Sequence, residues 1–212
     1  METTRNPSTR DPLTIAAIVT IAIILAYAIG MTSLDSRFWS VKLEFTFWCT
    51  AWTVIAHRTF TDRYSGFPPW LLPFNVSWEA FAIKDYTDPA SGWVPITEKP
   101  FFVLWFLLSC VHLWGVSLFN RRDFTGEKNE KWFWPAMLGT MACLVVSYSL
   151  FVARPGGEVK FYSILGELAV PVISSFFAVM MWRRSGTRGI SLPGNVLRVC
   201  AQYATLINRP TD

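Results

Sequence analysis

The feature that most restricts the fold of this chain is a series of long apolar segments without a charged side chain. Pro12–Leu34 has 23 residues, Pro100–Asn120 has 21 and Trp132–Ala153 has 22, all uncharged. A fourth run, Phe161–Trp182, is interrupted only by Glu167. Because a helix of about 20 residues crosses the ~30 Å hydrocarbon core of a bilayer, these runs predict a polytopic membrane protein.

Two weaker candidate spans lie between the first and second runs. Phe38–Phe60 is aromatic and apolar but contains charged residues, and Phe67–Ile83 contains three prolines. With these two we predict an all-α transmembrane bundle of six spans, with residues 1–212 forming one domain. Ile190–Ile207 is only moderately apolar. We expect it to form an interfacial helix, with a seventh span as the alternative.

The composition agrees with a membrane bundle and excludes several other classes. Hydrophobic residues make up 52% of the chain and charged residues 16%, compared with about 25% charged in an ordinary soluble domain. The 4 Cys are too few for a disulfide scaffold. Basic residues are scattered rather than clustered, which disfavours nucleic-acid binding.

The distribution of Lys and Arg predicts the orientation of the bundle. With six spans, thirteen of the 19 basic residues fall on the side that holds both termini, and six on the other. By the positive-inside rule we expect the N-terminus in the cytoplasm, with the chain in a bacterial inner membrane. Trp132, Trp134 and Trp182, at span ends on the basic side, agree with an interfacial aromatic belt.

Acidic residues inside the spans are the first candidates for function, because an unpaired charge in the bilayer costs several kcal/mol. Of the 15 acids, only Glu44, Glu79 and Glu167 fall within spans. They lie about 6, 7 and 10 Å, respectively, inside span ends that face the non-basic side. Their similar depth predicts convergence on one cavity, although Glu44 could instead be interfacial and Glu167 could have a structural partner.

Other side chains at this depth could complete a site. Asn75 lies four residues before Glu79 and therefore on the same helical face. Aromatic side chains at the matching level could stabilise a cation with their π faces, or could serve only in helix packing and the interfacial belt. These aromatic residues are Trp48, Trp78, Trp105, Tyr148 and Tyr162.

No metal ion or organic cofactor is expected. His57 and His112 have no ligand-like partner three or four residues away, and the cysteines form no Cys-x-x-Cys pair. Glycine-rich dinucleotide loops, Walker loops and Asp-rich diphosphate motifs are absent from the sequence.

One segment resembles a known family. Leu72–Glu79 reads Leu-Pro-Phe-Asn-Val-Ser-Trp-Glu. Its Asn-x-Ser-Trp-Glu run is similar to a motif of the integral-membrane terpene cyclases of fungal meroterpenoid and indole-diterpene biosynthesis. The preceding aromatic stretch, Ala51–Pro68, fits the same arrangement. The short length resembles the compact bacterial members that act in drimentine-type indole-sesquiterpenoid pathways.

The resemblance implies a reaction in which an acid protonates a terminal alkene or epoxide of a prenyl chain without ionising a diphosphate. The implied substrate is a prenylated aromatic such as a farnesylated indole, reached through the lipid bilayer. Glu79 takes the role of general acid, with Asn75 orienting it and Glu167 or Glu44 as partner or base. The fungal members have an Asp where this chain has Ser109, and a late Asp for which Glu167 is the only intramembrane counterpart.

Two other readings remain open from the residues. A sterol-isomerase-like bundle also pairs intramembrane acids with Trp to handle carbocations. A small proton-coupled transporter or accessory subunit could use the acids as a proton relay, but the sequence shows no internal repeat of the kind that many transporters contain.

Overall fold

The computed structural model describes residues 11–32, 39–66, 71–86, 99–122, 127–153 and 191–207. Within these ranges the chain is helical and forms no strand, which confirms the predicted all-α class for the described residues. The predicted span Phe161–Trp182 lies outside these ranges, and so do Tyr162 and Glu167, which belong to it. The helices are α1 (Pro12–Thr32), α2 (Trp39–Asp62), α3 (Leu72–Tyr86), α4 (Lys99–Phe119), the 3-10 helix η5 (Glu127–Trp132), α6 (Phe133–Val152) and α8 (Leu192–Ile207).

Proline marks where most of these helices begin. A proline has no backbone N–H to leave unpaired in the first turn, and its fixed φ suits a helix start. Among the described α-helices, only α2 lacks a proline within its first three residues. The prolines are Pro12 in α1, Pro73 in α3, Pro100 in α4, Pro135 in α6 and Pro193 in α8.

The end of α2 is fixed by a different device. Arg63 adopts a positive φ of 49°, and the Tyr64 N–H donates to the Thr59 carbonyl at 3.0 Å. This is the six-to-one hydrogen bond of a Schellman motif, which closes a helix with one left-handed residue. The chain therefore leaves α2 in a defined direction before it enters α3.

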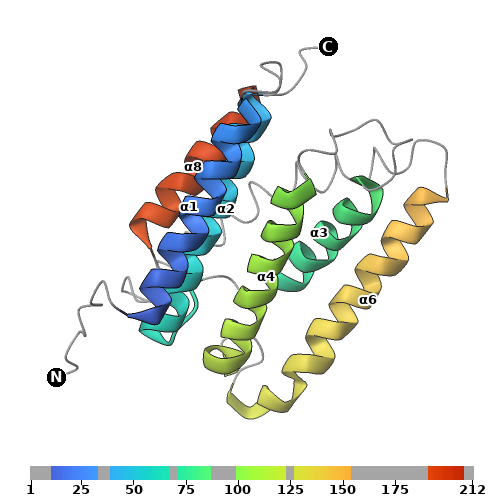
Figure 1. Ribbon diagram of the computed structural model, residues 1–212. Coiled ribbons are helices and arrows are strands. Elements are labelled where there is room, and N and C mark those ends of the chain that lie inside the picture. Colours follow the sequence, from blue (N-terminus) through green and yellow to red (C-terminus); the bar gives the residue numbers. More distant parts are fainter. Residues whose placement is uncertain are drawn as a thin grey trace.

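Figure 1 shows two groups of helices side by side. In one group α2 packs against both α1 and α8, and in the other α3 packs against both α4 and α6. Contacts between α2 and α4 join the groups. Ring contacts pair Phe45 with Phe102 and Phe60 with Phe119, so α2 and α4 run in the same direction.

Three of the described helices are long and apolar enough to cross a membrane, within Pro12–Gly30, Pro100–Phe119 and Asn129–Leu150. They coincide with the predicted spans Pro12–Leu34, Pro100–Asn120 and Trp132–Ala153. The outer faces of α1 and α6 carry large exposed apolar side chains, among them Ile29 at 70% and Leu150 at 63% exposure. Surfaces of this kind are suited to lipid rather than to water.

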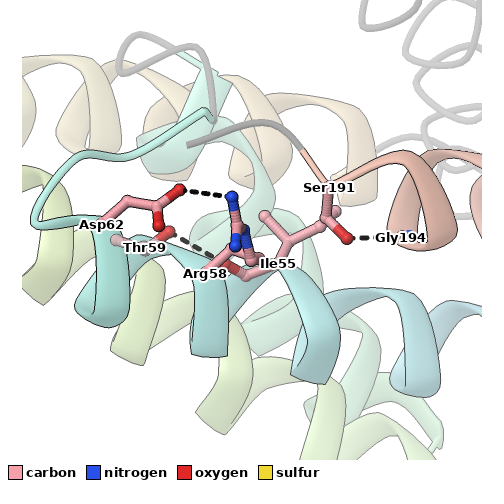
Figure 2. A network of polar contacts seen from close by, with 6 residues as sticks. All are labelled: Ile55, Arg58, Thr59, Asp62, Ser191 and Gly194. Carbon is pink, nitrogen blue, oxygen red and sulfur yellow. Dashed lines mark hydrogen bonds and ion pairs between the residues drawn. The ribbon is translucent and has the colours of Figure 1, made fainter. Parts of the chain in front are cut away.

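Helix α8 lies along α2 and is part of the bundle (Figure 1). A Cβ added to Gly194 would stand 2.7 Å from Ile55 Cγ1, so the two helices approach closely. Ser191 caps α8, because its Oγ accepts a hydrogen bond from the Gly194 N–H at 3.2 Å (Figure 2). Arg198 in the middle of α8 is buried, at 4% exposure. With 16 residues, α8 is not among the described helices that are long and apolar enough to cross a membrane.

Candidate active site

The best candidate site is built around Glu79, which is fully buried at the midpoint of α3. Ser109 of α4 donates a hydrogen bond from its Oγ to Glu79 Oε1, at 2.8 Å. The other carboxyl oxygen, Oε2, is buried and has no hydrogen-bond partner among the described residues. Among the described residues, the protein therefore holds one oxygen of this carboxyl and leaves the second without a partner.

The carboxyl of Glu79 lies at the level of the middle of α4. Its partner Ser109 is the central residue of α4, so it is about 15 Å from either end of that helix. The expected depth of about 7 Å was measured from Lys84 on α3 alone. Because α3 has only 15 residues, its end does not mark the same level as the ends of the longer α4.

Three tryptophans from three helices pack together beside this carboxyl. Trp105 of α4 stacks on Trp48 of α2, with ring centroids 5.5 Å apart and an interplanar angle of 14°. Trp78 of α3 meets Trp105 edge-on at 5.5 Å and 64°. We call these three residues the tryptophan cluster. Trp105 lies one turn before Ser109, and Trp78 directly precedes Glu79, so the cluster borders the carboxyl.

Two phenylalanines extend the cluster toward the start of α4. The rings of Phe45 and Phe102 each lie 6.2 Å from that of Trp105, one edge-on and one stacked. Edge-on and offset contacts of this kind stabilise aromatic groups beyond the area that they bury. The result is an aromatic wall that includes Trp48, Trp78 and Trp105, the three tryptophans expected at the level of the intramembrane acids.

Asn75 lies one turn before Glu79 on α3 and is buried, at 7% exposure. No hydrogen bond joins the side chains of Asn75 and Glu79 among the described residues. The orienting contact comes from Ser109 instead. The available sequence signal was a hydroxyl one turn after Trp105 in an uncharged span, but spacing alone could not pair it with α3.

Glu44 does not join Glu79 in the structure. It is half-buried on α2, one turn before Trp48. Trp48 pairs with Trp105, and Ser109 lies one turn further along α4. Glu44 is therefore roughly 12 Å from the level of Ser109 along the helix axes, on the other side of the tryptophan cluster. Its predicted convergence with Glu79 is not seen.

Tyr148 of α6 is buried, and its ring stacks on Phe81 with centroids 4.2 Å apart and an angle of 7°. The Lys84 ammonium lies 5.3 Å from the same ring. Phe81 lies two residues after Glu79, which corresponds to a rotation of about 200° around α3. Phe81, and Tyr148 of α6 that packs on it, therefore lie on a different side of α3 from the carboxyl of Glu79. The structure thus separates Tyr148 from the Glu79–Ser109 pair.

His112 is a buried side chain whose sequence context was considered above only for metal binding. It lies almost one turn after Ser109 at 1% exposure, and its Nε2 is 3.0 Å from the Trp52 carbonyl. Since a carbonyl only accepts, Nε2 carries the proton of this hydrogen bond. In the described ranges no three His, Cys, Asp or Glu side chains are placed to hold a metal ion.

No curated protein and no solved structure matches the chain. The model of the Pyr4-like transmembrane terpene cyclases matches residues 32–208, a stretch that runs from the end of α1 through α8 and contains the whole candidate site. The match covers well over half of the chain, which therefore belongs to the Pyr4-like transmembrane terpene cyclases, a family of membrane enzymes.

Proposed function

We propose that this cyclase acts on a prenyl chain, in the first instance farnesyl, attached to an indole or another aromatic group. Glu79 is the general acid that starts the reaction. The observation that carries the proposal is a fully buried carboxyl, with one oxygen unpartnered among the described residues, directly beside the tryptophan cluster. General acids placed in this way typically contribute factors of 10² to 10⁴ in rate.

The proposed reaction begins when the O–H bond of neutral Glu79 breaks. The proton adds to the terminal alkene, which becomes a carbocation, or to an epoxide oxygen, whose C–O bond then breaks to leave an alcohol and a carbocation. Glu79 is left as a carboxylate. Electron pairs of the following double bonds then close the rings, and the final cation loses a proton. Alkene or epoxide protonation consumes no cofactor, and no diphosphate leaves, so no metal is needed to activate one.

The tryptophan cluster has two roles in this scheme. The π faces of its rings stabilise positive charge by about 0.5 to 2 kcal/mol each, and more in desolvated sites. Its bulk also excludes water, which would otherwise capture the cation. The base for the final proton is proposed to be Glu167, or Glu44 beyond the cluster. Tyr148 and Tyr162 are proposed to line the remoter part of the substrate site.

The family assignment removes the support for a sterol-isomerase-like bundle and for a transporter. We place the N-terminus in the cytoplasm of a bacterial cell, with substrate entering from the bilayer. If α8 is a seventh span, eleven basic residues still lie on the N-terminal side and seven on the other. A reporter fused to the C-terminus tests this, because seven spans place it outside the cytoplasm and six place it inside.

The central experiment incubates membranes that contain the enzyme with a farnesylated indole and follows cyclised product by mass spectrometry. Glu79→Gln keeps the size of the side chain but has no acidic proton, and we expect the rate to fall about 10³-fold. Glu130→Gln is the matched control, since Glu130 is a partly exposed acid 3.4 Å from Arg122 and away from the site.

The outcomes separate the two parts of the proposal. Full activity in Glu79→Gln would show that another group supplies the proton. If the unchanged enzyme consumed no prenylated aromatic, the substrate class would be wrong, while its membership of the cyclase family would stand.

A further inference from the structure

We infer that Ser109 is a positioning residue that determines which oxygen of Glu79 bears the acidic proton. Its hydroxyl makes Oε1 the carbonyl oxygen of the neutral carboxyl and places the proton on Oε2. The inference rests on the proposed function in one respect, namely that Glu79 is the proton donor.

The first support is the direction in which the Ser109 hydroxyl points. Hydroxyl groups inside helices commonly donate to the carbonyl four residues back. Several in this chain do so: Thr20, Thr46, Thr53, Thr59, Thr140 and Ser149. Ser109 instead donates across to α3, where it meets Glu79 Oε1 at 2.8 Å. Its hydroxyl is therefore committed to the carboxyl and not to its own helix.

The second support is the asymmetry of the carboxyl. In a neutral carboxyl one oxygen only accepts and the other donates. Oε1 accepts from Ser109, so the donating oxygen is Oε2, which has no hydrogen-bond partner among the described residues. The proton on Oε2 thus has no described protein group that competes with the substrate for it.

The third support is the charge change during the reaction. When the proton leaves Oε2, negative charge spreads over both carboxyl oxygens, and the hydrogen bond from Ser109 becomes charge-assisted. A hydrogen bond that strengthens as charge develops stabilises the transition state more than the ground state. Both partners are buried, at 0% for Glu79 and 1% for Ser109, where such a bond is stronger than in water.

The test compares Ser109→Ala with Ser109→Thr, which keeps a hydroxyl, in the full-length enzyme in lipid nanodiscs. Ser117→Ala is the matched control, because Ser117 is a buried serine of α4 that donates to the Trp114 carbonyl instead. The first readout is the infrared C=O stretching band of the protonated carboxyl, assigned by its loss in Glu79→Gln. We expect this band to move to higher frequency in Ser109→Ala, and to stay in place in Ser109→Thr and Ser117→Ala.

The second readout is turnover of the farnesylated indole. We expect kcat to fall about tenfold in Ser109→Ala with KM nearly unchanged, because Ser109 contacts the acid and not the substrate. Ser109→Thr should recover most of the loss. If Ser109→Ala does not fold, Ser109→Cys replaces it, since the thiol fills the site but is only a weak donor.

An unmoved band in Ser109→Ala would overturn the inference whether or not the chain cyclises this substrate. A moved band with unchanged kcat would overturn the positioning role alone. Full turnover in Glu79→Gln would instead overturn the proposed function, while the infrared comparison would still report on the Ser109 contact. The two failures are therefore distinguishable.

Discussion

Helix α2 takes part in two contacts that are built in different ways. Toward α4 it presents large rings, with Trp48 stacked on Trp105 beside the buried carboxyl of Glu79. Toward α8 it presents Ile55, which Gly194 meets with no room for a Cβ. Small residues let two membrane helices approach closely, as Gly194 does here and as Gly115 of α4 does against Thr59 near the end of α2. The part of the α2–α4 contact beside Glu79 is instead filled by stacked rings.

Polar groups occur at both contacts. Near α8, Arg58 pairs with Asp62 at 2.9 Å (Figure 2). Thr59, whose methyl group faces Gly115 of α4, donates to the Ile55 carbonyl at 3.0 Å.

Beside the tryptophan cluster, Glu79 Oε2 and Trp105 Nε1 are buried without a hydrogen-bond partner among the described residues. A buried polar atom without a partner costs free energy of folding. Because Thr50 Oγ1 and Thr61 Oγ1 of α2 are also buried without a partner among the described residues, it is the acidic nature of the Glu79 carboxyl, more than the missing partner, that points to a use in function.

Among the changes that test this comparison, Gly194→Val is expected to have the largest effect. It should lower the free energy of unfolding and leave the catalytic reaction unchanged. The added side chain collides with Ile55, itself 2% exposed, and overpacking of this kind costs about 1 to 3 kcal/mol. The measurement is the unfolding free energy in a detergent titration. Gly139→Val is the control, because a Cβ at Gly139 meets nothing within 4 Å. Equal losses in the two variants would contradict the close α2–α8 contact.

The second prediction concerns Trp105→Phe, which should act on turnover more than on stability. The smaller ring offers a weaker π face to the cation, worth about 1 kcal/mol, or a roughly fivefold loss of kcat. Removal of the unpartnered Nε1–H offsets part of the packing that is lost. Trp134→Phe, at an exposed position of α6, is the matched control and should leave kcat unchanged. Similar kcat values for both variants would show that the cluster serves packing alone.

The smallest effect is expected from breaking the Arg58–Asp62 pair at the end of α2. The Arg58 side chain is 39% exposed, and exposed pairs four residues apart on a helix contribute about 0.3 to 0.5 kcal/mol. A double-mutant cycle with Arg58→Ala and Asp62→Asn measures this coupling from unfolding free energies. A coupling above about 1 kcal/mol would mean that the pair is part of the α2–α8 contact rather than a surface feature.

Some features of the structure follow from local sequence pattern alone. The prolines set helix starts because they act through their own backbone. Trp48, Trp78 and Trp105 meet because each lies at a similar level of an apolar helix. Ser109 and Glu44 show where this reasoning stops, since the position of each depends on how one helix is rotated and shifted against another.

By itself, the sequence determined that this chain is an all-α membrane protein and that Glu79, in its Asn-x-Ser-Trp-Glu run, is the acid to examine. The physical reason is that charge is so unfavourable in lipid that few acids remain inside the spans. Only the tertiary structure decided that Ser109 holds this carboxyl, that the tryptophan cluster borders it, and that Glu44 and Tyr148 lie elsewhere. Those outcomes depend on helix lengths and on side-chain packing between helices, which residue spacing within one helix does not contain.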